Sequence, residues 1–275
     1  MKKDFEYTCS DGELLRVTAY GENRKENARC IVYVHGFKGF KDWGFVPYIG
    51  EFLAAKGFFA LTFNFSHNGI GDNLTEFTED KKFAQNTFSR EQRELSELID
   101  AYRNGFFGPV NNPTVGLLGH SRGGGITLAT TAQKKAIKAA VVWSSVARWN
   151  RYSHEAVENW RRKGHLSVIN QRTGQVMRLN ATLLEDMELN DDRLNIEKAV
   201  KNLRPPLLVI HGQDDEGVPV AEAQEIFSWA NPDKSELLIV PDTGHTFGAK
   251  HPFEGSNDKL DLVLTKSAEF FDSNL

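Results

Sequence analysis

The sequence predicts an α/β fold, with a mostly parallel central sheet, helices on both faces and an inserted cap. Short, nearly continuous apolar segments alternate with amphipathic segments along most of the 275 residues, as in parallel strands joined by crossover helices. Residues 148–204 break this alternation and are rich in Arg, Glu and Asn. We therefore expect a core of residues 1–147 and 205–275 and a cap, or lid, of residues 148–204.

The expected sheet begins with two antiparallel strands. Residues 5–9 and 14–20 flank Asp11-Gly12, a pair typical of a hairpin turn. The strands after this hairpin are brief and apolar along their whole length, as expected of strands covered on both faces. These buried strands are predicted over residues 30–34, 58–63, 114–118, 139–143, 207–210 and 236–240.

Two helices are predicted from periodicity. Ser89 and Gln92 have the spacing of a capping box, and apolar residues recur at helical spacing from Leu95 to Tyr102. Residues 260–271 carry apolar residues near one face and predict a terminal helix that packs on the core.

Within the expected cap, Arg172-Thr-Gly174 is a plausible hairpin turn between residues 166–169 and 175–177. Three aromatic residues of the cap, Trp149, Tyr152 and Trp160, are candidates for lining an acyl or aryl pocket. The alternative, which is more common for aromatic residues in an insertion, is that they form a small core of the cap itself.

Composition narrows the class of protein. The chain is 40% hydrophobic and 25% charged, which is enough for a sizeable core. A net charge of −4 and a pI near 6.1 give no broad positive field, so we expect neither nucleic acid nor a membrane as partner, but a small molecule.

The first residues do not resemble a signal peptide, and we expect a cytoplasmic protein. Cys9 and Cys30 are expected to be buried small groups rather than a disulfide. No metal-ligand spacing and no cofactor motif is found, and the sequence does not indicate the oligomeric state.

Gly119-His-Ser-Arg-Gly123 matches G-x-S-x-G directly after the predicted strand 114–118 and before a helix-forming segment. This context is the one that the nucleophile elbow requires, since the glycines permit a tight strand-to-helix turn that exposes the serine hydroxyl. Ser121 is therefore the candidate nucleophile. Its hydroxyl needs a base, and in this arrangement an acid and then a histidine follow along the chain.

The acid and the base are expected in loops after the last two strands. His211-Gly-Gln-Asp-Asp-Glu-Gly-Val-Pro219 follows one strand, and Pro241-Asp-Thr-Gly-His245 follows the next. Both loops leave the carboxyl ends of parallel strands, where such sheets place their sites. Two neighbouring aspartates, Asp214 and Asp215, are candidates for the acid.

With these motifs the chain resembles the α/β-hydrolase superfamily, and within it the cap-bearing esterases, cinnamoyl esterases and acyl-peptidase-like enzymes. The resemblance covers the core from about residue 30 onward, without the cap. It implies Asp215 as the acid, by an H-G-x-x-D-x-x-V-P pattern, and His245 as the base. One oxyanion donor is expected to be the N–H of Arg122, next after the nucleophile. The loop His35-Gly-Phe-Lys-Gly39 resembles the family's H-G-x-x-G loop, which implies the N–H of Phe37 as the second donor.

These residues predict acyl transfer to water through an acyl-enzyme. A serine at the elbow argues against relatives that use a carboxylate there to open epoxides or displace halide. We expect a small or medium acyl or aryl ester as substrate, with an acylaminoacyl- or dipeptidyl-peptidase-like amide hydrolase as the alternative. A hydrolase-fold protein that only binds is less well supported, because serine, acid, histidine and both oxyanion loops all match.

Overall fold

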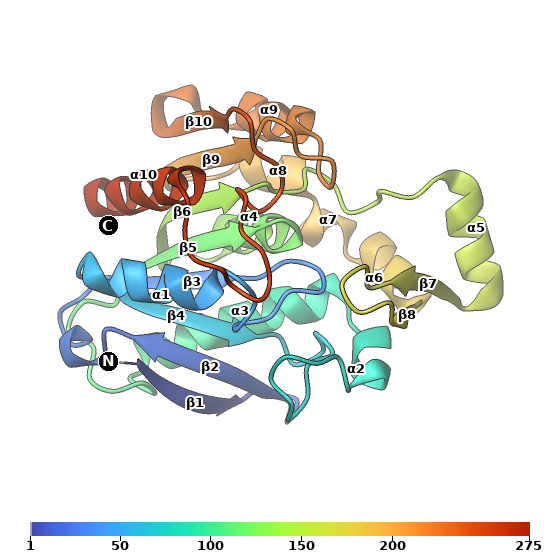
Figure 1. Cartoon of the computed structure of the whole chain (residues 1–275), viewed down its shortest axis with the longest axis horizontal. Coiled ribbons are helices and arrows are strands. Elements are labelled where there is room, and N and C mark those ends of the chain that lie inside the picture. Colours follow the sequence, from blue (N-terminus) through green and yellow to red (C-terminus); the bar gives the residue numbers. More distant parts are fainter. Residues whose placement is uncertain (1) are drawn as a thin grey trace.

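The computed structural model describes residues 2–275 and contains a central sheet of eight strands in the order β1-β2-β4-β3-β5-β6-β9-β10 (Figure 1). β1 and β2 pair antiparallel, β2 and β4 also pair antiparallel, and all later neighbours are parallel. The predicted α/β class is confirmed. The strands of this sheet are β1 (Lys2–Thr8), β2 (Leu14–Tyr20), β3 (Cys30–Val34), β4 (Phe59–Asn64), β5 (Val115–His120), β6 (Ile137–Trp143), β9 (Leu207–Gly212) and β10 (Ser235–Val240).

Helices cover both faces of the sheet (Figure 1). α1 (Val46–Ala55) and α10 (Asp258–Asn274) share one apolar cluster with the sheet, and α10 contains the predicted terminal helix. On the other face lie α3 (Phe88–Arg103), α4 (Arg122–Gln133) and α9 (Val220–Trp229), and the short α2 (Asp80–Ala84) precedes α3 along the chain. β3, β4, β5 and β9 are buried at every position, which explains why their sequences are apolar throughout. Cys9 and Cys30 are both buried.

The start of α3 differs from the sequence prediction. Thr87, not Ser89, is the N-cap residue, and its side-chain oxygen accepts a hydrogen bond from the N–H of Arg90 at 3.2 Å. Ser89 lies inside the first turn, where its own N–H donates to Asp186 Oδ2 at 3.0 Å. A threonine two residues upstream serves the helix equally well, because any short oxygen-bearing side chain caps the orphan N–H groups.

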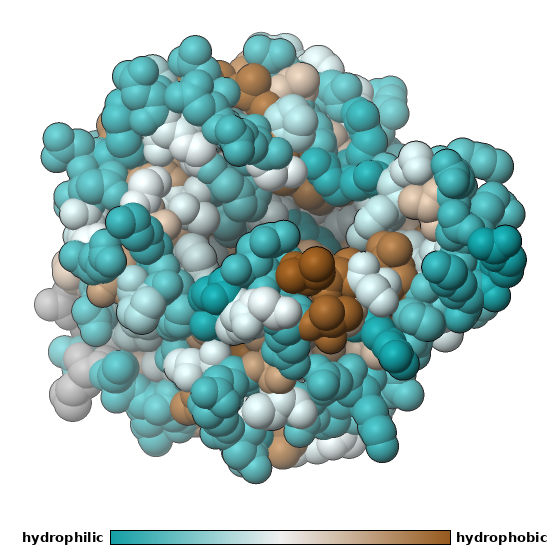
Figure 2. All heavy atoms as spheres, turned by 45° about the vertical axis from the view of Figure 1, so that its right-hand side comes forward, coloured by the Kyte–Doolittle hydropathy of each residue, from teal (hydrophilic) through white to brown (hydrophobic). Residues whose placement is uncertain are grey.

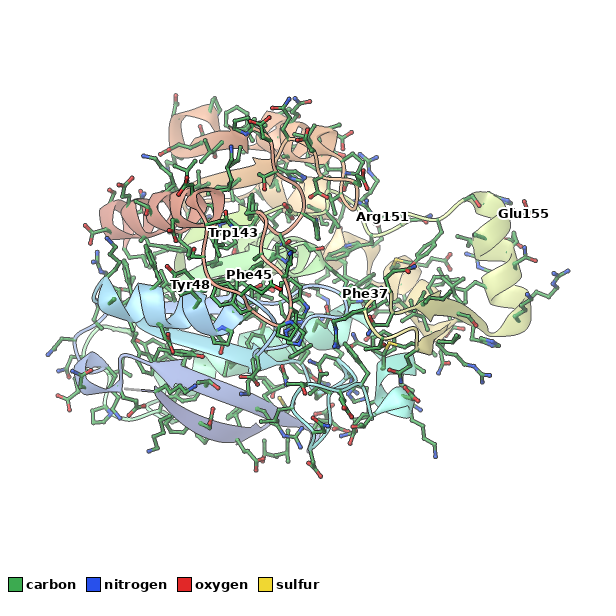
Figure 3. The ribbon with its side chains drawn as sticks, in the orientation of Figure 1. Phe37, Phe45, Tyr48, Trp143, Arg151 and Glu155 are labelled. Atoms are coloured by element: carbon green, nitrogen blue, oxygen red, sulfur yellow. The ribbon has the colours of Figure 1, made fainter. Side chains whose placement is uncertain are left out.

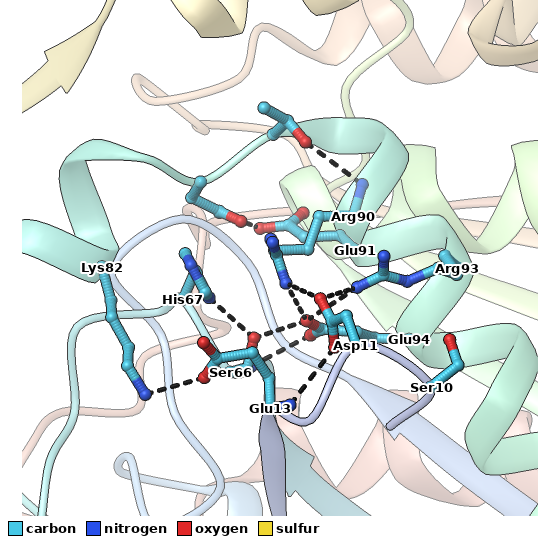
Figure 4. A network of polar contacts seen from close by, with 12 residues as sticks. Ser10, Asp11, Glu13, Ser66, His67, Lys82, Arg90, Glu91, Arg93 and Glu94 are labelled. Carbon is cyan, nitrogen blue, oxygen red and sulfur yellow. Dashed lines mark hydrogen bonds and ion pairs between the residues drawn. The ribbon is translucent and has the colours of Figure 1, made fainter. Parts of the chain in front are cut away.

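A polar network fixes α3 to the β1–β2 turn (Figure 4). Asp11 Oδ2 accepts from Arg90 at 2.6 Å and from Arg93 at 2.5 Å. The fully buried side chain of Glu94 accepts from the N–H of Ser66 at 3.0 Å. Burial raises the pKa of Glu94 to about 7, so the protonated and ionised forms of this carboxyl are both populated near neutral pH.

The segment expected to form the cap contains α5 (His154–Lys163), the hairpin β7 (His165–Ile169) and β8 (Val176–Asn180), α6 (Thr182–Leu189), α7 (Asp191–Leu194) and α8 (Ile196–Lys201). The hairpin matches the turn expected at Arg172-Thr-Gly174. In Figure 1, α5 and this hairpin project beyond the core, whereas α8 packs against α4 and α9, with Ile196 and Val200 in the core cluster. The division at 148–204 stays a prediction. No helix in residues 2–275 has the length and apolar character needed to cross a membrane.

Candidate active site

Ser121 sits in the sharp turn between β5 and α4. Its backbone is left-handed, with φ 57° and ψ −125°, a conformation that costs a non-glycine residue free energy and that is common at functional sites. The two motif glycines are required by space. A Cβ on Gly119 would lie 2.3 Å from Thr127 Oγ1, and one on Gly123 would lie 2.3 Å from the carbonyl oxygen of Val34. The N–H of Ser121 donates to the carbonyl oxygen of Trp143 at 2.9 Å, which joins the turn to β6.

The structure brings His245 and Asp215 together. Asp215 follows β9, His245 follows β10, and His245 Nδ1 lies 2.7 Å from Asp215 Oδ2. The other carboxylate oxygen of Asp215 accepts from the N–H groups of Gly217 at 2.8 Å and Val218 at 2.9 Å. Burial alone would raise the pKa of Asp215, but hydrogen bonds from His211 and His245 hold it well below its usual range. Asp215 is therefore an ionised acceptor for His245 Nδ1–H. Asp214, its neighbour, is exposed.

Two further histidines support this pair. The fully buried His211 has its Nε2 2.8 Å from the carbonyl oxygen of Val218 and 3.3 Å from Asp215 Oδ2. Both partners are acceptors, so His211 Nε2 carries a proton and steadies the acid loop. His120 Nε2 donates to the carbonyl oxygen of His245 at 2.8 Å, and burial lowers the pKa of His120 to about 3. His120 therefore stays neutral and holds the His245 loop by one hydrogen bond.

Ser121 and His245 line a common cavity of about 420 Å³. Within residues 2–275 no hydrogen bond joins Ser121 Oγ to His245 Nε2, a contact that often tightens only when substrate is bound. The cavity has walls from the Phe37 loop, from the aromatic side chains of Phe40 and Trp43, and from the turn of the β7–β8 hairpin. Figure 2 shows the hollowed face on this side of the molecule, with apolar side chains at its rim.

The loop that contains Phe37 runs against the nucleophile. A Cβ on Gly36 would lie 2.9 Å from Ser121 Cβ, so only a glycine allows the loop to approach so closely. His35 Nδ1 donates to the carbonyl oxygen of Gly36 at 2.9 Å, and its Nε2 accepts from the N–H of Phe65 at 3.2 Å. Burial lowers the pKa of His35 to about 4, which keeps this tautomer neutral. Figure 3 places Phe37 on the side of the core that faces the β7–β8 hairpin.

Arg122 and Phe37, the two predicted oxyanion residues, are also in contact through their side chains. The Arg122 guanidinium lies 4.7 Å from the ring centroid of Phe37 and pairs with the buried carboxylate of Glu91 on α3, at 2.6 Å. Burial raises the pKa of Glu91, and the Arg122 guanidinium opposes that shift. The N–H of Arg122 is the first of α4, so it belongs to the positive end of the helix.

The three aromatic residues that were candidates for substrate binding, or for a small core of their own, lie outside the Ser121 cavity. Trp149 stacks on Phe88 with centroids 4.3 Å apart and lines a separate cavity of about 780 Å³. Tyr152 and Trp160 pack edge to face at 5.2 Å, and Trp160 is 1% exposed. Residues 170–172, in the turn of the β7–β8 hairpin, line the Ser121 cavity instead. The predicted turn at Arg172 was the signal in the sequence, but periodicity could not show which way the hairpin points.

No cluster of three or more His, Cys, Asp or Glu side chains in the described part of the chain is arranged to hold a metal ion. The polar side chains that line the cavity instead include those of Ser121, four histidines, three cationic residues, and the neutral Asn170, Gln171 and Thr246. What this arrangement can do without a further group is activate a hydroxyl for attack on a carbonyl.

Comparison with known proteins agrees with the geometry. Residues 52–273 match the sequence profile of the prolyl oligopeptidase family. The chain belongs to this family. No curated protein matches the sequence significantly. Membership in the prolyl oligopeptidase family identifies the chain as a hydrolase of the α/β-hydrolase fold, which confirms the resemblance inferred from the motifs.

Solved structures show the same fold at low sequence identity. DcsB in complex with a substrate analogue has a TM-score of 0.78 at 14% identity, with 100% of each chain covered. A hydrolase from Agrobacterium vitis S4 has a TM-score of 0.74 at 15% identity and 98% coverage of each chain. Est1E from Butyrivibrio proteoclasticus with bound ferulic acid has a TM-score of 0.71 at 19% identity, again with 98% of each chain covered.

Proposed function

We propose that the chain is a serine hydrolase that cleaves a carboxylic ester of a small or medium acyl or aryl substrate through an acyl-enzyme. The observation that carries the proposal is the 2.7 Å contact between His245 Nδ1 and the ionised Asp215, in the cavity that also contains the strained Ser121. The Nδ1–H donated to Asp215 leaves the lone pair of Nε2 free, which is the tautomer a general base needs.

In the proposed reaction, His245 Nε2 takes the proton of Ser121 as Oγ bonds to the ester carbonyl carbon. The carbonyl oxygen becomes an oxyanion that accepts from the N–H groups of Phe37 and Arg122. The carbon–oxygen bond to the alcohol then breaks, and His245 returns the proton to the leaving oxygen. A water molecule repeats the sequence, giving the free acid and regenerating Ser121. Asp215 stays ionised throughout and stabilises the imidazolium.

Amide hydrolysis is the second candidate, since the matching family is one of oligopeptidases. The same groups would serve, with His245 protonating an amine rather than an alkoxide. The cavity of about 420 Å³ favours an ester of small or medium size over an extended peptide. Est1E, a structural neighbour, holds ferulic acid, so a hydroxycinnamate ester belongs in any substrate test.

The test is a panel of 4-nitrophenyl esters from acetate to octanoate, methyl ferulate, and acylated amino-acid and dipeptide 4-nitroanilides. We expect kcat/KM for at least one ester to exceed every anilide, and Ser121→Ala to abolish turnover. The matched control is Ser228→Ala, which removes an exposed hydroxyl that bonds only the carbonyl oxygen of Glu225. Faster cleavage of anilides would favour amide hydrolysis. Full activity in Ser121→Ala would exclude both ester and amide hydrolysis through Ser121.

A further inference from the structure

The cavity around Ser121 has an unbalanced charge. Lys38, Arg172 and Lys250 line it, whereas no aspartate or glutamate among the described residues does. Lys250 pairs with Glu254 at 3.2 Å, but Lys38 and Arg172 form no ion pair within residues 2–275. This local excess of positive charge contrasts with a net charge of −4 for the whole chain. A cavity lined by one sign of charge attracts the opposite sign in its ligand.

Lys38 is held at the boundary between core and cap. Its backbone is left-handed, with φ 57°, and its ammonium donates to the carbonyl oxygen of Ile169 at the end of β7, at 3.1 Å. An ammonium has three N–H donors, so two remain for other partners. Burial lowers the pKa of Lys38, which reflects the cost of a cation with no anion beside it.

Asn170, next in the chain after Ile169, adds an unpaired donor. Its side chain is 5% exposed, and its Oδ1 accepts from the N–H of Arg172 at 3.2 Å, which fixes the orientation of the amide. The amide nitrogen Nδ2 is buried without a hydrogen-bond partner. Buried polar groups are normally paired, and Asn170 is one of the residues that line the cavity, so we take this amide as a donor for an acceptor on the ligand.

These donors come from two loops that meet beside the nucleophile. Lys38 directly follows the predicted oxyanion residue Phe37, while Asn170 and Arg172 belong to the turn of the cap hairpin. The cavity is also lined by the apolar Phe40 and by the ring of Trp43, which stacks on His251 with centroids 6.0 Å apart. The site thus combines apolar side chains with a group of donors that has no acidic side chain beside it.

We infer that the substrate carries an anionic oxygen group, a carboxylate or a phosphate, that binds to Lys38, Asn170 and Arg172 while its apolar part lies against Phe40 and Trp43. The inference rests on the proposed ester hydrolysis and names its substrate class. A planar guanidinium and an amide N–H₂ match the oxygen pairs of a carboxylate, and an adjacent ammonium adds charge.

The catalytic test compares 4-nitrophenyl hemiglutarate with 4-nitrophenyl valerate, two esters of equal chain length that differ in a terminal carboxylate. We expect kcat/KM to favour the anionic ester by on the order of ten-fold at low salt, and the preference to fall as ionic strength rises. Arg172→Gln and Lys38→Gln should each remove most of that preference. The matched control is Arg178→Gln, which removes the same charge from β8 of the same hairpin outside the cavity.

A binding test separates this inference from the proposed function. Calorimetry with 4-phenylbutyrate, 3-phenylpropyl phosphate and the neutral 4-phenylbutyramide needs no turnover. Tighter binding of either anion than of the amide, lost in Arg172→Gln, supports the inference and identifies the anionic group. Equal binding of all three, or equal effects of Arg172→Gln and Arg178→Gln, would overturn it. A protein that binds the anion but cleaves no ester would refute only the proposed hydrolysis.

Discussion

Asp215→Asn is the substitution that probes the proposed machinery most sharply. Asp215 Oδ1 accepts from two backbone N–H groups, so that side of the side chain must remain an oxygen in the variant. The new amide nitrogen then takes the place of Oδ2 and faces His245 Nδ1. Two donors cannot share that contact. His245 must therefore adopt the other tautomer, with the proton on Nε2, and can no longer accept the proton of Ser121.

The expected loss follows from that change of tautomer. In a related triad the corresponding change lowers kcat by about 10⁴, which is about 5.5 kcal/mol of transition-state free energy. Stability should change less than activity, because the side chain keeps its volume and both backbone hydrogen bonds, and loses besides the His245 contact only the longer one from His211 Nε2, at 3.3 Å. The assay is kcat with the best ester of the panel, together with urea unfolding of the same preparation.

Asp214→Asn is the matched control, because Asp214 is the adjacent residue in the same loop and its side chain is exposed. We expect less than about three-fold change in kcat for this variant, as for most surface substitutions. A reversed ranking, or a loss below ten-fold in Asp215→Asn, would refute the assignment of the acid.

Three further predictions concern stability and are measured by urea unfolding. Arg122→Ala removes the cation that pairs with Glu91, whose side chain is 1% exposed, and should lower the free energy of unfolding by about 3–5 kcal/mol. Combining it with Glu91→Leu should recover much of the lost stability. A single variant as stable as the wild type would contradict the buried ion pair. The pKa of Glu94 in the folded protein, about 7, exceeds the ordinary value of 4.5, so its contribution to stability is greatest below about pH 4.5 and is lost as the pH rises to about 7. Relative to Glu94→Gln, the wild type should therefore lose stability across this pH range. A difference in stability that stays constant with pH would refute the raised pKa. Trp160→Ala should cost about 3–5 kcal/mol because its ring is buried and packs against Tyr152. A change below about 1 kcal/mol would show that the packing of α5 does not depend on this ring.

Much of the fold was predictable because each core strand is covered on both faces. β3 and β9 are buried at every residue, so their apolar sequences predicted their positions to within two residues. The turn at Asp11-Gly12 likewise predicted the opening hairpin. The N-cap of α3 was placed wrongly, because Thr87 and Ser89 both carry a capping oxygen and only the path of the preceding chain decides between them.

The cap was less predictable, because its contacts join segments that are distant in sequence. Ile196 lies within residues 148–204, the segment expected to form the cap, yet it packs in the core with α4 and α9. Trp149 and Trp160 were candidates for substrate binding by residue type alone. The β7–β8 hairpin, which brings Asn170 and Arg172 to the cavity, is held by contacts with segments distant in sequence, such as the one from Lys38 to Ile169. No pattern within the hairpin encodes that contact.

The central proposal is that Ser121 is the nucleophile, and covalent labelling tests it most directly. The measurement is the intact mass of the protein after reaction with a small fluorophosphonate, followed by peptide mapping of the labelled site. We predict one adduct per chain, on Ser121, with none formed in Ser121→Ala and a much slower reaction in Asp215→Asn. An adduct on another residue, or undiminished labelling of Ser121→Ala, would contradict the proposed mechanism.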